Sequence, residues 1–255
     1  MIRGSTAVFA VLGHPVQHSG SPALHNRWIR AARIDAVYVA LMPPMDAEPV
    51  SVFRAAGLRG ANLTRPFKEV ARPDAWDPVA ARTGAINTLV RGPIGVVGLN
   101  TDVPGFQAAL ADAAPALRPQ RVVVLGAGGA AAAVIVALQE LGARTIAVHA
   151  RSMTKAAALA RRLGADDARD LAAPLHGADL VVNTTARDAD LSAVPTPNGT
   201  YFDVNYGVRG GLVGRCRGAG LPTFTGEGML RHQAALAFTA WFGHPPPLGR
   251  GDRKG

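Results

Sequence analysis

The sequence predicts an α/β protein of two domains. Short apolar runs alternate with stretches of helical periodicity over most of the 255 residues, a pattern typical of sheets with largely parallel strands. Two such series occur, and an apolar helical stretch at residues 103–117, with Pro115 near its end, separates them. A glycine-rich turn follows the first strand of the second series. We therefore expect two α/β domains with a hinge near residues 103–117, and this length is ample for two cores.

The first series contains four apolar runs and one helix start with its own signals. The predicted strands are Ala7–Leu12, Ala36–Leu41, Gly60–Leu63 and Ile86–Val90. We expect the first helix to open at Ser21, because a serine side chain can cap free backbone amides. Pro22 then suits the first helical position.

The second series repeats the pattern and is followed by one more helix. Its predicted strands are Val122–Leu125, Thr145–Val148, Leu180–Val182 and Tyr201–Val204. The last helical pattern, Gly228–Phe242, follows the final strand of this series. We therefore expect this C-terminal helix to return to the first domain.

The turn after the first strand of this series has the spacing of a dinucleotide-binding loop. Residues 126–131 read G-A-G-G-A-A and match G-x-G-x-x-[G/A] between a strand and a helix. Gly126 permits the tight turn, and Gly128 lets the backbone approach a pyrophosphate at the helix amino terminus. The expected contacts are Gly126, Ala127, Gly128, Gly129 and Ala130. This loop favours a Rossmann-like, doubly wound domain; a glycine-rich turn without a ligand is the alternative.

The end of the next predicted strand indicates which dinucleotide is preferred. An NAD site commonly carries a carboxylate there, whereas this chain has Arg151 and Ser152, with Lys155 one turn later. Cationic and hydroxyl groups suit a 2′-phosphate. We therefore expect NADP as the cofactor, the alternative being that Arg151 is a solvated residue at a helix start.

The basic balance of the chain does not by itself indicate nucleic-acid binding. The net charge is +9, but 24 of the 27 basic residues are arginines scattered along the chain. The densest basic patch is the tail with Arg250, Arg253 and Lys254, and aromatic residues make up only 5%. We expect anionic small molecules as ligands and no nucleic acid.

Several classes of protein are disfavoured by what the sequence lacks. The single cysteine, Cys216, excludes an internal disulfide, and the seven histidines show no metal-binding spacing, so we expect no metal. Arg215 and Arg217 flank Cys216, yet a packed, inert thiol is favoured over a reactive one. No apolar run of membrane-spanning length and no secretory signal occur. We therefore expect a cytoplasmic protein without a membrane anchor.

Polar residues gather at predicted strand ends of the first domain. They occupy residues 18–22, 62–69 and 84–88 together with 98–102, where α/β sheets commonly bind ligands. Each stretch alone could be a helix cap or an Asx turn. Lys68 is one of three lysines against 24 arginines, and only lysine can give up its proton at accessible pH. These stretches therefore predict a ligand site, with Lys68 as a possible acid or base and a solvated lysine as the alternative.

Together these motifs resemble the shikimate dehydrogenase family over roughly residues 7–243. The matching segments, in family order, are 13–22 (GHPVQHSGSP), 62–69 (NLTRPFKE), 84–88 (GAINT), 100–102 (NTD), 126–131 and 226–233 (GEGMLRHQ). The resemblance implies NADPH-dependent reduction of 3-dehydroshikimate to shikimate, with Lys68 and Asp102 as the catalytic pair. It also implies a substrate-binding catalytic domain at 1–104 plus 228–255 and an NADP-binding Rossmann domain at 105–227.

The same resemblance implies roles for further residues. Ser19, Ser21 and Thr64 would bind the substrate carboxylate, while Asn87 and Gln233 would bind ring hydroxyls. The implied remainder of the site is Tyr206 in the substrate pocket, with Thr184, Gly226 and Met229 on the cofactor side. Physically, a hydride delivered to a ketone requires a proton donor near the oxygen, which is a suitable role for Lys68.

Two alternatives stay open from the sequence. A family relative could act on quinate or on an aminated shikimate analogue, with NAD as cofactor, because such substrates differ in few ring substituents. A non-catalytic nucleotide-binding regulatory protein is the other alternative, which the presence of both Lys68 and Asp102 disfavours. Both a monomer and a homodimer are compatible with the sequence.

Overall fold

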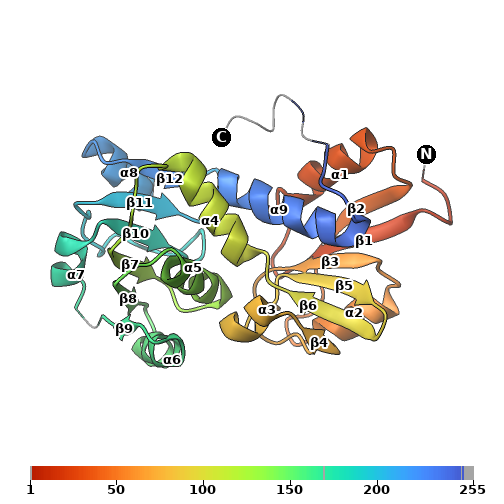
Figure 1. Ribbon diagram of the computed structural model, residues 1–255, viewed down its shortest axis with the longest axis horizontal. Coiled ribbons are helices and arrows are strands. Elements are labelled where there is room, and N and C mark those ends of the chain that lie inside the picture. The colour runs from red at the N-terminus through yellow and green to blue at the C-terminus, as the bar shows by residue number, and fades with distance from the viewer. Residues whose placement is uncertain (1, 169, 248, 250–255) are drawn as a thin grey trace. The chain divides into compact units, whose positions relative to one another are not determined.

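A computed structural model describes residues 2–168, 170–247 and 249 (Figure 1). The chain forms two compact units: unit 1 comprises Met1–Gly105 and Leu230–Gly255, and unit 2 comprises Phe106–Met229. The boundary between them falls within helices α4 (Asp102–Ala113) and α9 (Glu227–Phe242). Arg250, Arg253 and Lys254 of the predicted basic tail lie outside the described residues.

Unit 1 contains a six-stranded sheet with the order β2-β1-β3-β5-β6-β4. Its strands are β1 (Ala7–Leu12), β2 (Ala36–Leu41), β3 (Gly60–Leu63), β4 (Ala75–Trp76), β5 (Thr88–Gly92) and β6 (Gly95–Leu99). Strands β1, β2 and β3 are parallel, whereas β5 is antiparallel to both β3 and β6.

The β5–β6 hairpin corrects the expectation of a largely parallel sheet in this half. Gly92 pairs with Gly95, so only Pro93 and Ile94 join the two strands. A connection this short can link only antiparallel strands. The strand predicted at Ile86–Val90 accordingly begins two residues later, at Thr88.

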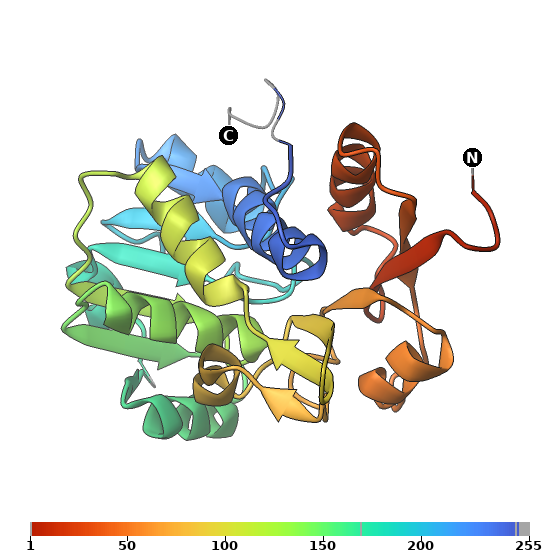
Figure 2. The same ribbon diagram turned by 45° about the vertical axis from the view of Figure 1, so that its right-hand side comes forward.

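Three helices belong wholly to unit 1: α1 (Ser21–Ala31), α2 (Pro49–Ala55) and α3 (Pro78–Thr83). Helix α1 packs beside β1 and β2, as Figure 2 shows. The prediction that the Ser21 side chain caps α1 is wrong. Gly20 is the N-cap and makes no side-chain hydrogen bond, while Ser21 is the first helical residue and is buried. Pro22 therefore occupies the second position rather than the first.

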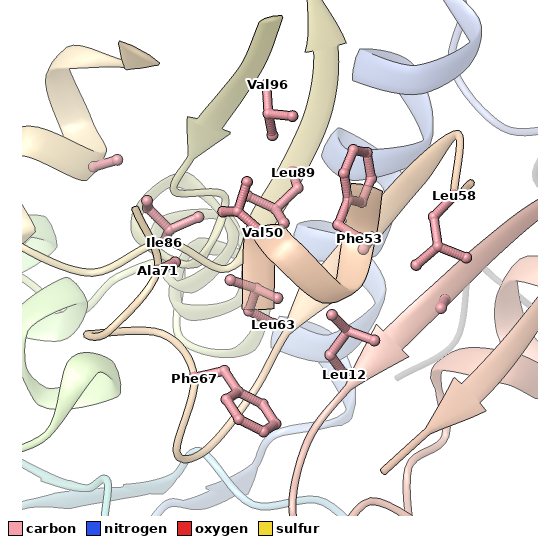
Figure 3. Close-up of a cluster of buried hydrophobic side chains, with 13 residues drawn as sticks. Leu12, Val50, Phe53, Leu58, Leu63, Phe67, Ala71, Ile86, Leu89 and Val96 are labelled. Carbon is pink, nitrogen blue, oxygen red and sulfur yellow. The ribbon is translucent and has the colours of Figure 1, made fainter. Parts of the chain in front are cut away.

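Successive residues of a strand point to opposite faces of the sheet, and in unit 1 both faces carry buried side chains. One face, shown in Figure 3, carries Leu12, Leu63, Leu89 and Val96 under Val50 and Phe53 of α2. Burial of each such large side chain stabilises the fold by about 1.5–3 kcal/mol.

The C-terminal helix covers the other face. Phe9 and Val11 of β1 pack there with Trp28 of α1 and with Ala234 and Phe238 of α9. The expected return of this helix to the first domain is therefore confirmed. Its apolar residues complete a core that the N-terminal segment alone leaves open.

Unit 2 contains a fully parallel sheet with the order β12-β11-β10-β7-β8-β9. Its strands are β7 (Arg121–Leu125), β8 (Thr145–His149), β9 (Asp166–Asp167), β10 (Leu180–Asn183), β11 (Thr200–Asp203) and β12 (Thr223–Thr225). The strand order reverses between β7 and β10, which is the switch point of a doubly wound fold. The predicted Rossmann-like architecture is thus confirmed.

Helices α5 (Gly129–Glu140), α6 (Met153–Leu163), α7 (Ala172–Gly177) and α8 (Gly211–Gly218) complete unit 2. Val123 and Val181 pack against α7 and α8, while α5 contacts β7. The alternate residues Val122 and Val124 are buried as well, so both faces of this sheet are covered. Among the described residues no helix has the length and apolarity needed to cross a membrane.

Candidate active site

Lys68 and Asp102 form an ion pair in unit 1. Lys68 follows β3 in a loop, and Asp102 is the first residue of α4. The Lys68 Nζ donates to Asp102 Oδ2 over 2.5 Å, and the two side chains are 19% and 6% exposed. A pair this shielded from water is sensitive to the loss of either member, because a single charge would then remain uncompensated.

Asn87 holds the second carboxylate oxygen of Asp102. Its Nδ2 donates to Asp102 Oδ1 over 2.8 Å, and its Oδ1 accepts from the backbone N–H of Thr101, also over 2.8 Å. A backbone N–H can only donate, so this contact fixes which side of the Asn87 amide faces Asp102. Asn87 thereby orients the carboxylate that pairs with Lys68.

Gln233 reaches this cluster from α9. Its Oε1 lies 3.5 Å from Asn87 Nδ2, and its own Nε2 donates to Leu230 O over 2.9 Å. Gly105 allows the approach, since a Cβ at this position would lie 2.7 Å from the Gln233 Cβ. The structure thus brings four predicted residues of unit 1 together: Lys68, Asn87, Asp102 and Gln233.

The three predicted hydroxyl residues lie on two adjacent segments: Ser19 and Ser21 in the loop and first helical residue after β1, and Thr64 directly after β3. The register pairs Leu12 with Leu63, and His14 N donates to Arg65 O beyond the strand ends over 2.9 Å. Ser19 Oγ accepts from the backbone N–H of Ser21 over 3.3 Å. Within the described part of the chain, no hydrogen bond links Ser19, Ser21 or Thr64 to the Lys68–Asp102 pair.

Buried polar residues around Asp102 lie in the polar stretches predicted from the sequence, but they were not given individual roles there. Asn100 Oδ1 accepts from the backbone N–H of Asp102 over 3.0 Å, while its Nδ2 donates to Ala85 O over 2.8 Å. Asn62 and Thr88 hydrogen-bond to each other behind Asn87. Asn62 gave one usable signal, because an amide in a predicted buried strand needs partners.

In unit 2 the glycine loop has the backbone geometry that its sequence predicts. Gly126 has φ +117°, and a Cβ there would collide with the Thr184 side chain. Gly128 is the N-cap of α5 and supplies no side-chain hydrogen bond to the first turn. A glycine at the N-cap lets the backbone approach a pyrophosphate at the amino terminus of this 12-residue helix.

The predicted phosphate corner adjoins this loop. Gly126 N donates to His149 O over 2.8 Å, and Arg151, Ser152 and Lys155 lie exposed just beyond β8. Ser152 is also the N-cap of α6, accepting from Lys155 N over 3.4 Å. The neighbouring strand β9 carries two exposed carboxylates, Asp166 and Asp167. This strand was not predicted from the sequence, because two residues show no periodicity.

The other predicted residues of unit 2 lie near the ends of β10, β11 and β12. Thr184 Oγ1 donates to Leu125 O over 2.8 Å, so this hydroxyl ties the turn after β10 to β7. Gly226 N donates to Asn205 O over 3.0 Å, and Met229 is buried near the start of α9. Tyr206 is half-buried in the turn after β11.

Two carboxylates hold the Tyr206 turn: Asp203, which opens the D-x-x-Y motif that ends at Tyr206, and Glu227, which was given no role from the sequence. Asp203 Oδ1 accepts from Asn205 N over 2.9 Å, and Glu227 Oε1 accepts from Gly207 N over 2.7 Å. Burial alone would raise the pKa of Glu227, but hydrogen bonds from Thr225 and Gly207 outweigh it and lower that pKa. Glu227 is thus stabilised as a carboxylate.

The structure also bears on the minor predictions. No group of three or more histidine, cysteine or acidic side chains in the described ranges could hold a metal ion. Burial raises the pKa of the Cys216 thiol to about 11, outweighing the opposing charge of Arg215. The packed, inert thiol was therefore the better interpretation.

Comparison with known proteins agrees with these features. Residues 11–89 match the family described as shikimate dehydrogenase substrate binding domain, residues 109–192 match shikimate / quinate 5-dehydrogenase, and residues 226–250 match the shikimate 5'-dehydrogenase C-terminal domain. A shikimate dehydrogenase (NADP(+)) of Methylobacterium radiotolerans is 42% identical, with 92% of this chain and 91% of that protein covered. The chain belongs to the shikimate dehydrogenase family.

Solved structures of shikimate dehydrogenases have the same fold. Shikimate 5-dehydrogenase from Thermus thermophilus, in complex with NADP(H) and shikimate, superposes with a TM-score of 0.84 at 37% identity, covering 94% of this chain and 95% of that one. Shikimate dehydrogenase from Aquifex aeolicus gives a TM-score of 0.87 at 31% identity, covering 97% and 96%. The likeness extends over both units, so this shikimate dehydrogenase family member has both parts of the two-domain architecture.

Proposed function

We propose that this protein is an NADP-dependent oxidoreductase that reduces 3-dehydroshikimate to shikimate. The observation that carries the proposal is the shielded Lys68–Asp102 pair with Asn87 on its second oxygen. A solvated surface lysine would not be held this way. The NADP-dependent naming of the 42% identical relative and the family membership support the same reaction.

Lys68 and Asp102 can perform the proton transfer that ketone reduction needs. NADPH, when bound, supplies the hydride. As the carbonyl carbon is reduced, negative charge develops on its oxygen, and the Lys68 ammonium donates a proton there to complete the hydroxyl group. In the reverse direction the neutral Lys68 amine takes the same proton back. Asp102 holds Nζ in place and can accept a hydrogen bond from a substrate hydroxyl.

The remaining polar residues of unit 1 suit the other groups of the substrate. Ser19, Ser21 and Thr64 supply hydroxyl groups on the adjacent segments that follow β1 and β3, and such donors fit a carboxylate. Asn87 and Gln233 present amides that fit ring hydroxyls, and Tyr206 of unit 2 is assigned to the substrate by family resemblance.

The cofactor residues belong to unit 2. We assign the pyrophosphate to the turn of Gly126, Ala127, Gly128, Gly129 and Ala130. The 2′-phosphate is assigned to Arg151, Ser152 and Lys155, whose exposed cationic and hydroxyl groups suit it. Thr184, Gly226 and Met229 are assigned to the nicotinamide end.

The setting of the enzyme follows the same reasoning. A single, free and buried cysteine is compatible with a reducing compartment, so we place the enzyme in the cytoplasm. Its partners are then its small-molecule substrate and cofactor, and it acts as a monomer or a homodimer. A second substrate, quinate, is favoured by one observation, the shikimate / quinate description of the family at residues 109–192.

An absorbance assay at the nicotinamide band tests the proposal. The purified protein receives shikimate or quinate in turn, each with NADP or NAD. We expect fast reduction of the cofactor with shikimate and NADP only. Activity favouring quinate or NAD would assign the protein to the second substrate, and no activity in all four mixtures would refute a dehydrogenase of this class.

A further inference from the structure

Tyr38 places a hydroxyl group behind the proposed site. It lies in β2, is 1% exposed, and stacks on the buried His25 ring with centroids 4.4 Å apart and planes 11° apart. Its hydroxyl lies 2.6 Å from Asn62 Oδ1 on β3. The stack fixes the ring, and the ring fixes the position of the hydroxyl.

The direction of this hydrogen bond follows from the other partners of Asn62. Asn62 Nδ2 lies 3.2 Å from Asn87 O, and a carbonyl oxygen can only accept. The amide therefore presents its oxygen to Tyr38, and Tyr38 is the donor. The same Nδ2 also donates to Thr88 Oγ1 over 3.1 Å.

The Thr88 hydroxyl links Asn62 to Asn87. Having accepted from Asn62, the Thr88 hydroxyl donates its single proton to Asn87 Oδ1 over 3.1 Å. Asn87 Nδ2 then donates to Asp102 Oδ1 over 2.8 Å. A directed chain of hydrogen bonds therefore runs from Tyr38 through Asn62, Thr88 and Asn87 to the carboxylate that pairs with Lys68.

All the intermediate groups of this chain are buried. Asn62 is 6% exposed, Thr88 is fully buried and Asn87 is 2% exposed. Water therefore cannot readily replace a missing partner. Loss of the Tyr38 hydroxyl would leave Asn62 Oδ1 buried without this donor and would weaken the hold of Asn62 on Thr88 and Asn87.

We infer that Tyr38 is a positioning residue for the reaction, acting through Asn62, Thr88 and Asn87 on the orientation of Asp102. This inference rests on the proposed function, because it assigns Asp102 a role in catalysis. Tyr38 itself is not expected to touch substrate. The contrary view is that Tyr38 only fills the aromatic core with His25, Trp28 and Trp241.

The Tyr38→Phe variant separates these two roles, because it keeps the ring and removes only the hydroxyl. Loss of one well-oriented buried hydrogen bond predicts a kcat lowered about fivefold to twentyfold. The KM values for 3-dehydroshikimate and NADPH should stay within about twofold, since uniform binding is not affected. Thr88→Val should have a similar effect, and Thr88→Ser, which keeps the hydroxyl, should restore most of the activity.

Combining the two substitutions tests whether Tyr38 and Thr88 act through the same series of hydrogen bonds. The double variant Tyr38→Phe with Thr88→Val should lower kcat about as much as either single change, whereas independent effects would multiply. Phe53→Leu is the control, because Phe53 is fully buried in the hydrophobic cluster on the opposite face of the sheet from Tyr38. It should lower the melting temperature and leave kcat near the wild-type value.

Each outcome supports or overturns the inference. A lowered kcat with non-additive variants and rescue by Thr88→Ser supports it. A lower melting temperature with unchanged kcat in Tyr38→Phe, or effects that multiply in the double variant, would overturn it. An inactive wild-type protein would instead refute the proposed function, which is a distinguishable result.

Discussion

The Nζ of Lys68 lies 2.5 Å from Oδ2 of Asp102, although 34 positions separate the two residues in the chain. Lys68 lies in the loop after β3, and Asp102 is the first residue of α4, directly after the turn that follows β6. Asn100 and Thr101 set that turn through their backbone and side-chain contacts with Asp102 and Asn87. The pair is therefore a product of how β3, β5 and β6 adjoin in the sheet.

Replacing Lys68 tests its role as the proton donor. Lys68→Ala should lower kcat by about 10²–10⁴-fold, the usual range for a lost acid or base. NADPH binding, followed by fluorescence, should stay near normal. Lys68→Arg is the matched control, since arginine keeps the charge beside Asp102 but does not release its proton. Recovery of activity in Lys68→Arg would show that only the charge matters, and near-normal turnover of Lys68→Ala would remove Lys68 from the mechanism.

Arg151 should discriminate between the two nicotinamide cofactors. Arg151→Ala should weaken NADPH binding about tenfold and leave NADH binding nearly unchanged, because only NADPH carries a 2′-phosphate. Titration of each cofactor by fluorescence measures both affinities. Arg161→Ala, an exposed arginine in the last turn of α6, serves as the control for lost positive charge. An equal loss for both cofactors would make Arg151 structural.

Gly126 should not tolerate a side chain. Gly126→Ala places a methyl group against Thr184 and imposes the strain of a positive φ, which costs about 1–3 kcal/mol by itself. We expect a lower melting temperature and weakened NADP binding. Gly142→Ala is the matched control, because Gly142 also has a positive φ but its Cβ would meet open space. If both variants bind NADP as the wild type does, the loop does not bind the pyrophosphate.

His25 should make the folded protein sensitive to acid. Burial lowers the pKa of His25 to about 3 from an ordinary 6.5, and both ring nitrogens lack a hydrogen-bond partner among the described residues. Between these values the unfolded chain binds a proton that the folded chain does not, so stability falls as the pH drops. The slope from this group approaches about 1.4 kcal/mol per pH unit.

Urea unfolding of the wild type and of His25→Phe at several pH values between about 4.5 and 7.5 measures this contribution. The free energy of unfolding of His25→Phe should depend less steeply on pH below 6.5. Identical slopes for the wild type and His25→Phe would mean that His25 is protonated in the folded state.

Local patterns predicted the regular parts of the molecule well. The strands at Ala7–Leu12 and Ala36–Leu41 are continuous apolar runs, and such runs carry their own signal. The predicted strand Gly60–Leu63 is found unchanged, and the predicted Val122–Leu125 begins one residue earlier, at Arg121. The β5–β6 hairpin was missed because Gly-Pro-Ile-Gly reads as a loop and only the pairing of the flanking strands defines it. Strand β9 has only two residues and is defined by its pairing with β8, which the sequence does not show.

The sequence by itself determined the chemistry that is available: a glycine turn, an unusual lysine, basic groups after β8 and polar residues at strand ends. These features depend only on residue type and on spacing over a few positions, so they can be recognised in the sequence alone. Only the tertiary structure decided which of these groups meet. Asp102 pairs with Lys68, and Asn87 reaches both Asp102 and Gln233, because strand register and helix return bring distant segments together. The chain from Tyr38 to Asp102 has the same origin, since each of its hydrogen bonds depends on where its partner lies in a buried, water-poor interior.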